Sequence, residues 1–186
     1  MTDLYPTVRS APPTTLRIMQ HAQAHIFREI RRRRLARSAR VEALFLRTTG
    51  QEWFNHYGND TAGLTMEGLY GTEEGIPWKT RTDLVLYMYG MPGLGVLLIY
   101  HKYGGGFSEA YTSKGDMSRL REWVRNLHND PLPVGLFIPF KSAWLAVKEF
   151  IETDGALPKS IEWVANKDLP AGTFPDPGSP HLEAQK

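Results

Sequence analysis

Short apolar runs punctuated by glycine and proline dominate the middle of the chain. Residues 82–90 ("TDLVLYMYG") and 95–103 ("GVLLIYHKY") are rich in Val, Ile, Leu and Tyr and flank a "GMPGLG" turn. Residues 64–70 ("LTMEGLY") alternate apolar and polar side chains, and residues 107–113 ("FSEAYTS") repeat this pattern more weakly. Because alternation and enrichment in β-branched and aromatic residues are typical of strands, these four segments predict neighbouring strands joined by short turns.

One helix stands out, at residues 142–155 ("SAWLAVKEFIETDG"). Its apolar positions recur at helical spacing: Ala143, Val147, Phe150 and Ile151. Lys148, Glu149 and Glu152 can face water. Ser142 is suited to cap the first turn, and Gly155 is suited to end the last one. The pattern predicts an amphipathic helix that packs against the sheet.

The segments around this helix are shorter. Residues 118–127 ("SRLREWVRNL") fit a short helix or a strand, residues 134–139 ("VGLFIP") fit a buried strand or extended segment, and residues 161–165 ("IEWVA") fit a short strand. Proline and glycine predict a poorly ordered tail from Leu169 onward. Adjacent strands bracketed by helices predict an α+β fold with a mostly antiparallel sheet of short strands packed by helices.

A basic helix is expected near the start of the chain, capped by Thr14 or Thr15. Its apolar stripe consists of Leu16, Met19, Ala22, Ile26 and Ile30. From Arg28 to Arg40 there are seven arginines in thirteen residues. Because like charges repel along a helix, these arginines require solvent or an anionic partner. Both a solvated helical face and a contact with nucleic acid or an acidic surface remain open.

Charge divides the chain into unlike parts. Residues 1–40 hold nine Lys and Arg against two acids, a net charge of +7, whereas residues 41–186 hold thirteen against eighteen, a net charge of −5. Together with the expected elements, this predicts three parts: an N-terminal basic helical extension (1–60), an α+β domain (61–168) and a flexible tail (169–186).

Composition excludes several functional classes. The 41% of apolar and 23% of charged residues are ordinary for a soluble globular protein, and no apolar run approaches the length of a membrane span. The absence of cysteine removes disulfides, thiolate nucleophiles and cysteine-based zinc sites. The first residues lack the apolar core of a secretory signal. We therefore expect a cytoplasmic protein without a membrane partner.

The stretch "YHKYGGGFSEAY" (100–111) resembles a functional glycine loop in part. A phosphate-binding loop requires a Lys-Ser/Thr pair that opens a helix, and none follows Gly106. A nucleophile elbow requires glycine on both sides of the serine, but Ser108 is followed at two residues' distance by Ala110. The glycines are better explained as a turn between two strands.

Histidines and carboxylates offer few catalytic combinations. His101 and Ser108 flank the glycine turn and could meet across a hairpin, which leaves a hydrolase as a weaker alternative, although no acid is indicated that would orient the imidazole. His21 and His25 have metal-compatible spacing without a third ligand. We expect no metal, no cofactor and no catalytic residue.

Two carboxylate pairs also occur in the sequence. Glu73 and Glu74 are expected on a loop, and Glu149 and Glu152 on an exposed helical face. Such pairs are more often solvated surface than acid–base machinery.

The second half of the chain resembles family one of the bacterial polymorphic-toxin immunity proteins, over residues 64–165. The resemblance rests on the strand pair "DLVLYMYG…GVLLIYHK", the turn into "GGGFSEAY", and the closing unit "PFKSAWLAVKEFIETDGALPKSIEWV". Within the closing unit it rests on Pro139, Ala146, Val147, Glu149, Phe150, Thr153, Gly155, Pro158, Ile161, Glu162 and Trp163. The arginine-rich segment is not part of this resemblance.

The resemblance implies a cytoplasmic antitoxin that binds a cognate secreted toxin, such as a nucleic-acid deaminase, and blocks its active site. A body with a net charge of −5 would be attracted to the basic groove of a toxin that acts on nucleic acid. Exposed tyrosines beside acidic side chains are typical of protein–protein interfaces. The residues expected at the toxin contact are Glu73, Glu74, Tyr103, Phe107, Glu109, Tyr111 and Asp116. The alternative is a nucleic-acid-binding module that uses the arginine-rich helix.

Overall fold

A computed structural model provides the structure of the chain. It describes residues 15–19, 42–43, 45–46, 53, 61–67, 77 and 80–176. The arginine-rich segment Arg28–Arg40, the carboxylates Glu73 and Glu74, and residues 177–186 therefore lie outside the described residues.

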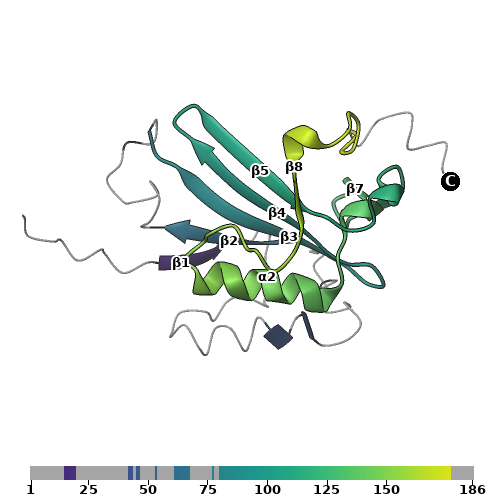
Figure 1. Ribbon diagram of the computed structural model, residues 1–186, viewed down its shortest axis with the longest axis horizontal. Helices are drawn as coiled ribbons and strands as arrows, with labels where there is room; N and C mark the ends of the chain where they lie inside the picture. Colours follow the sequence, from purple (N-terminus) through teal and green to yellow (C-terminus); the bar gives the residue numbers. More distant parts are fainter. Residues whose placement is uncertain are drawn as a thin grey trace, which may run out of the picture.

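The fold is α+β, as the sequence predicts, and is built on an antiparallel sheet of six strands in the order β1-β2-β3-β4-β5-β8 (Figure 1). The strands are β1 (Thr15–Met19), β2 (Thr61–Glu67), β3 (Asp83–Met91), β4 (Gly95–Gly104), β5 (Phe107–Ser113) and β8 (Trp163–Ala165). Each predicted strand in the middle of the chain is confirmed, although β2 begins three residues earlier than the alternation suggests. Strands β3, β4 and β5 pair antiparallel in sequence order, so a short turn is enough to join each strand to the next.

The start of the predicted N-terminal helix is wrong. Residues 15–19 form β1, which pairs antiparallel with β2 so that Ile18 lies opposite Leu64. The apolar residues Leu16 and Ile18 fit a period of two as well as a helical stripe, and the free edge of β2 satisfies the backbone of this segment. A neighbouring strand therefore outweighs the weak helical periodicity.

Two glycines turn the chain between β4 and β5. Gly105 and Gly106 have φ values of 57° and 83°, and Gly104 pairs with Phe107 across the turn. Positive φ at both central residues is the requirement of a type I′ hairpin turn, in which glycine has no steric penalty. The glycine run is therefore the tip of a hairpin, as the sequence predicts.

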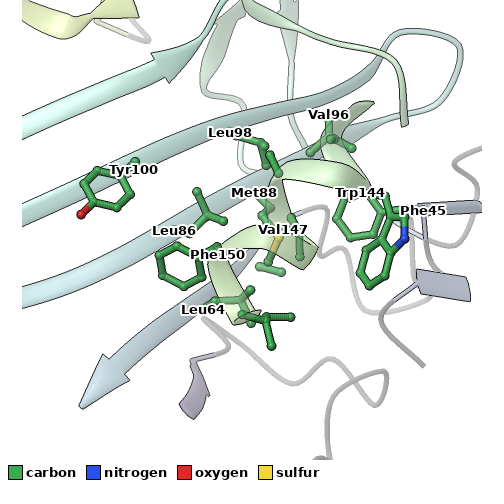
Figure 2. Packing of buried hydrophobic residues seen from close by; sticks show 14 of the residues in the cluster. Phe45, Leu64, Leu86, Met88, Val96, Leu98, Tyr100, Trp144, Val147 and Phe150 are labelled. Carbon is green, nitrogen blue, oxygen red and sulfur yellow. The ribbon is translucent and has the colours of Figure 1, made fainter. Parts of the chain in front are cut away.

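Helix α2 (Phe140–Glu152) lies across one face of the sheet and begins two residues before the expected cap, Ser142 (Figure 1). Its N-cap is Pro139, whose carbonyl accepts a hydrogen bond from the Ala143 N–H at 3.0 Å. The buried face consists of Ala143, Trp144, Ala146, Val147, Phe150 and Ile151. Figure 2 shows the helical side chains packed against Leu86, Met88 and Leu98 of the sheet. Burial of this apolar stripe is what holds the helix in place.

Residues from the expected N-terminal extension contribute to this same core. Phe45 and Trp53 are buried, and their rings meet edge to face with centroids 5.4 Å apart. Phe45 also lies 5.8 Å from the ring of Trp144 on α2. A Cβ at Gly90 would lie 2.1 Å from the Trp53 indole, so this position of β3 requires glycine. The core thus combines the sheet with residues that lie between β1 and β2 in the sequence.

The opposite face of the sheet carries a second, smaller core. It is covered by a two-stranded sheet of β6 (Trp123–Arg125) and β7 (Pro131–Pro133) and by short 3₁₀ turns, η3 (Met117–Arg119) and η4 (Val134–Leu136). Its fully covered residues are Leu97, Leu132, Leu136 and Phe137. The ambiguous segment at 118–127 therefore contains both a helical turn and a strand. Residues 134–139 are buried except Pro139, and they begin as a turn before extending.

The expectation of a loose tail from Leu169 is wrong for its first eight residues. The chain leaves β8 through η5 (Asn166–Asp168), and the Trp123 indole N–H donates to the Thr173 carbonyl at 3.1 Å. Thr173 is buried, and its hydroxyl donates to the Pro170 carbonyl at 2.7 Å. These contacts satisfy the backbone of a proline-rich segment that has no regular structure. Within the described residues, no helix has the length and apolar character needed to cross a membrane.

Candidate functional site

The most exposed feature of the sheet is the far half of the β4–β5 hairpin, residues 101–110, which we call the hairpin arm. Strand β8 pairs only with the last three residues of β5, Tyr111 to Ser113. Coverage by α2 reaches Tyr100, whose ring lies 6.3 Å from that of Phe150. Beyond this point the hairpin extends past β8 (Figure 1). Side chains of the arm are half-buried or exposed, which makes it accessible to a partner.

The face of the arm that continues from the α2 side carries charged and aromatic groups. Lys102 lies directly opposite Glu109, and its ammonium is 6.0 Å from the centroid of the Phe107 ring. The Tyr111 hydroxyl donates a hydrogen bond to Glu109 Oε1. This bond to the carboxylate is the main reason that the pKa of Tyr111 is raised, with burial adding to it. Phe107 is 47% exposed, so an apolar ring is available beside a fixed carboxylate.

The other face of the arm carries a cluster of aromatic and polar groups. The rings of His101 and Tyr103 stack with centroids 4.4 Å apart, and His101 Nε2 lies 3.2 Å from the Ser108 hydroxyl. Burial lowers the pKa of His101 and, with Tyr87 and Asp83 nearby, raises the pKa of Tyr103. A neutral imidazole stacked on a phenol forms a flat polar and aromatic surface of the kind used in protein recognition.

The structure brings together three of the predicted contact residues and separates the others. Phe107, Glu109 and Tyr111 share one face of β5, whereas Tyr103 pairs with Ser108 and points to the opposite face. They do not form one edge, because successive residues of a strand alternate between faces. Glu73 and Glu74 lie outside the described residues.

Asp116 lies at the other end of β5, three residues after its last member. It caps η3, accepting from the Ser118 N–H at 3.1 Å and from the Ser118 hydroxyl at 2.6 Å. These hydrogen bonds hold the pKa of Asp116 below its usual value. The residue therefore has a structural role at a distance from the hairpin tip.

The sequence did not indicate three residues that lie beside the predicted contact residues. Lys102 lies opposite Glu109, whereas Tyr87 and Asp83 lie on the face of Tyr103. The signal was present in the alternation of β3 and β4, because Asp83 lies opposite Tyr103 and Tyr87 is on the same face. Strand pairing had to be known before that alternation placed them together. The predicted approach of His101 and Ser108 is confirmed.

This pair lacks the remaining parts of a catalytic site. In the part of the chain that the structure describes, no carboxylate is hydrogen-bonded to the His101 ring, and no cluster of three potential metal ligands occurs. A catalytic serine requires a base that is itself oriented by a third group. The geometry of the arm favours recognition over hydrolysis.

An open groove of about 900 Å³ lies on the other side of β8 from the arm, between the η3–β6 segment and residues 170–176. Its lining includes Trp123, Phe174, Arg121 and Asp176. Asp176 is the only carboxylate in its lining, which contains no histidine or lysine, so the groove offers little for acid–base chemistry.

Comparison with known proteins supports recognition as the function. Residues 90–165 match the model of the family described as immunity protein Imm1, which covers 76 of the 186 residues. No curated protein and no solved structure matches. The matched segment begins within β3, ends with β8, and contains the whole hairpin arm and α2. Residues 90–165 thus form an Imm1-type segment, which supports an immunity-protein role and implies a cognate toxin protein as the partner.

Proposed function

We propose that this protein is an antitoxin that binds a cognate secreted bacterial toxin and inhibits it by covering the toxin's active site. The observation that carries the proposal is the position of the Imm1 match, which contains the exposed aromatic and charged arm. An inhibitor of this kind needs a sizeable interface with a few aromatic anchors. Phe107 and Tyr103, on opposite faces of the arm, are suited to that role.

A nucleic-acid deaminase is the toxin class that we favour. Residues 41–186 have a net charge of −5, and an enzyme that acts on nucleic acid presents a basic groove. Opposite charges accelerate association and disfavour wrong partners. The resemblance of the sequence to immunity proteins that are paired with deaminases points in the same direction. We place the encounter in the cytoplasm, where such a toxin reaches its substrate.

Inhibition by occlusion predicts a stoichiometric effect. The test is to purify the toxin domain encoded by the adjacent reading frame and to titrate its deaminase activity with this protein. Activity should fall linearly and end at one equivalent, and the two proteins should copurify. Inactivation by a small fraction of an equivalent would indicate an enzyme instead. If the two proteins do not bind and cells are not protected, the proposal is wrong.

The arginine-rich segment supports a second candidate, a nucleic-acid-binding module. Seven arginines between Arg28 and Arg40 could neutralise several phosphates, and the resulting affinity would fall steeply with salt. Titration of labelled DNA and RNA at two salt concentrations tests this candidate. Binding that persists in moderate salt and is lost when the seven arginines are replaced by glutamine would favour it over the antitoxin.

A further inference from the structure

The outer edge of β5 is unpaired over more than half of its length. On one side, β5 is paired with β4 from Phe107 to Thr112. On the other side, β8 pairs with Tyr111, Thr112 and Ser113 only. No strand in the described part of the chain pairs with residues 107–110 on that side. This leaves a short exposed sheet edge at the end of the hairpin arm.

The pairing pattern identifies the backbone groups that face outward. The Lys114 N–H donates to the Glu162 carbonyl on the β8 side at 3.0 Å. Because backbone groups of an antiparallel strand alternate between its two neighbours, Ser108 and Ala110 face the same outer side. Gly104 and Phe107 close the two-residue turn, so their backbone groups pair with each other across the hairpin. Phe107, Glu109 and Tyr111 therefore bond to β4, while Ser108 and Ala110 present N–H and C=O groups outward.

These outward groups form a rigid template. The described residues provide no backbone partner for Ser108 or Ala110 on the outer side. The type I′ glycine turn and the continuous pairing with β4 hold the segment extended before any partner arrives. Exposed edges are commonly protected by proline, by bulges or by clustered charges. Residues 107–110 contain no proline, their register with β4 is unbroken, and Glu109 is their only charge.

We infer that an extended segment of the toxin adds to the sheet as a strand along Phe107–Ala110, with a basic side chain near Glu109. This inference rests on the proposed function and specifies how the partner is held. Only an extended backbone matches the alternating donors and acceptors of an edge. Side chains of such a strand would cover the exposed ring of Phe107. The carboxylate of Glu109, which accepts a hydrogen bond from the Tyr111 hydroxyl, attracts a lysine or arginine.

A second copy of this chain is a poorer occupant of the edge. Pairing Ser108 of one copy with Ala110 of the other would use the outward groups of both copies. That register places Glu109 directly opposite Glu109, and like charges in this position destabilise a strand pair. A basic segment from a different protein has no such penalty. In this register, the charge on the edge disfavours self-association.

Amide hydrogen exchange of the complex with the toxin domain from the adjacent reading frame is the direct test. The Ser108 and Ala110 amides should exchange at least tenfold more slowly in the complex than in the free protein. The Glu109 amide, already bonded to β4, should be protected in both states and is the internal control. This alternation is the signature of strand addition, because docking through side chains would not protect every second amide.

Matched substitutions provide a second test. Ser108→Pro removes the outward N–H, which an edge strand tolerates, and should weaken toxin binding at least thirtyfold. Ser108→Ala keeps the N–H and loses only the side-chain contact with His101, so it should weaken binding much less than Ser108→Pro does. Ala110→Pro and Ala110→Val form a second pair with the same logic. Thermal unfolding of each variant without toxin shows whether the fold is intact, and the exchange experiment on the unsubstituted protein does not depend on any variant folding.

The possible outcomes separate the two proposals. Toxin binding without protection of Ser108 and Ala110 would overturn strand addition and leave the antitoxin function standing. Absence of toxin binding would overturn both. Protection of these amides in the free protein together with dimers in analytical ultracentrifugation would identify a second copy as the occupant, and would overturn the inference.

Discussion

The imidazole of His101 and the hydroxyl of Ser108 lie 3.2 Å apart, facing each other from β4 and β5. This contact resembles half of a catalytic pair, but stacking of His101 on Tyr103 and its lowered pKa indicate a neutral ring in a recognition surface.

Replacing Ser108 by alanine tests this interpretation. Ser108→Ala should leave protection of cells against the toxin intact, because only an exposed hydrogen bond is lost. The free energy of unfolding should change by less than about 0.5 kcal/mol, as is usual for surface substitutions. Cell survival during toxin expression, with denaturant unfolding of the purified variant, measures both. Complete loss of protection by a folded Ser108→Ala variant would revive the hydrolase interpretation.

The exposed ring of Phe107 should be an anchor for the toxin. Phe107→Ala is expected to raise the Kd about tenfold or more, as truncation of a central aromatic residue does at many interfaces. Because the ring is 47% exposed, stability should change little. Leu145, which is 53% exposed on α2, provides the matched control. Calorimetric titration of Phe107→Ala and Leu145→Ala should show a loss only for the first, and equal losses would place the interface elsewhere.

Ser113 is a buried polar link between the two cores. It is completely buried, its hydroxyl donates to the Leu136 carbonyl at 2.8 Å, and the Leu98 N–H donates to it at 3.0 Å. Ser113→Ala leaves the buried Leu98 N–H and Leu136 carbonyl without their hydrogen-bond partner. It should therefore lower the free energy of unfolding by about 2 kcal/mol. Urea denaturation checks the value. Ser142→Ala on α2 is the control and should stay within about 0.5 kcal/mol, because alanine favours the helix.

Glu149 should make stability depend on pH. Its carboxylate accepts from the backbone N–H groups of Lys159 and Ser160, each at 2.9 Å. The bond from Lys159 is the main reason that the pKa of Glu149 lies below its ordinary value of 4.5. The sequence predicts that Glu149 lies on a solvent-exposed helical face. In the structure its carboxylate binds the backbone of the loop between α2 and β8 and stabilises that loop.

Because the pKa is lowered by folding, this stabilisation is fully present above pH 4.5 and is lost as the pH falls through the folded value. Glu149→Gln should cost roughly 1 kcal/mol at pH 7, a figure reduced by solvent screening. Its difference from the unsubstituted protein should shrink toward pH 3. Denaturation at a series of pH values measures this. Glu152→Gln, whose ion pair with Lys148 is exposed, should show almost no difference at any pH.

Local sequence patterns were sufficient to predict the central hairpins and α2. The extent of β5 agrees residue for residue with the alternation at 107–113, and the paired glycines give the turn that follows β4. Strand alternation, helical spacing and turn chemistry act within a few residues, so the amino-acid sequence carries them directly. The resemblance of the closing unit to immunity proteins likewise needed only neighbouring residues.

Other features depended on partners distant in the chain. Residues 15–19 became a strand because β2 offered a free edge, and the segment around Thr173 is held by Trp123. The local pattern of residues 15–19 fits a strand and a helix equally, and the local pattern around Thr173 gives no sign of its contact with Trp123.

The sequence by itself determined the α+β class, the hairpin and the resemblance of its second half to immunity proteins. Only the tertiary structure decided that Tyr103 and Phe107 lie on opposite faces of the arm, and that β8 stops short and leaves Ser108 and Ala110 open. Periodicity is a property of one segment, whereas register and edge exposure are set by hydrogen bonds between segments far apart in the chain.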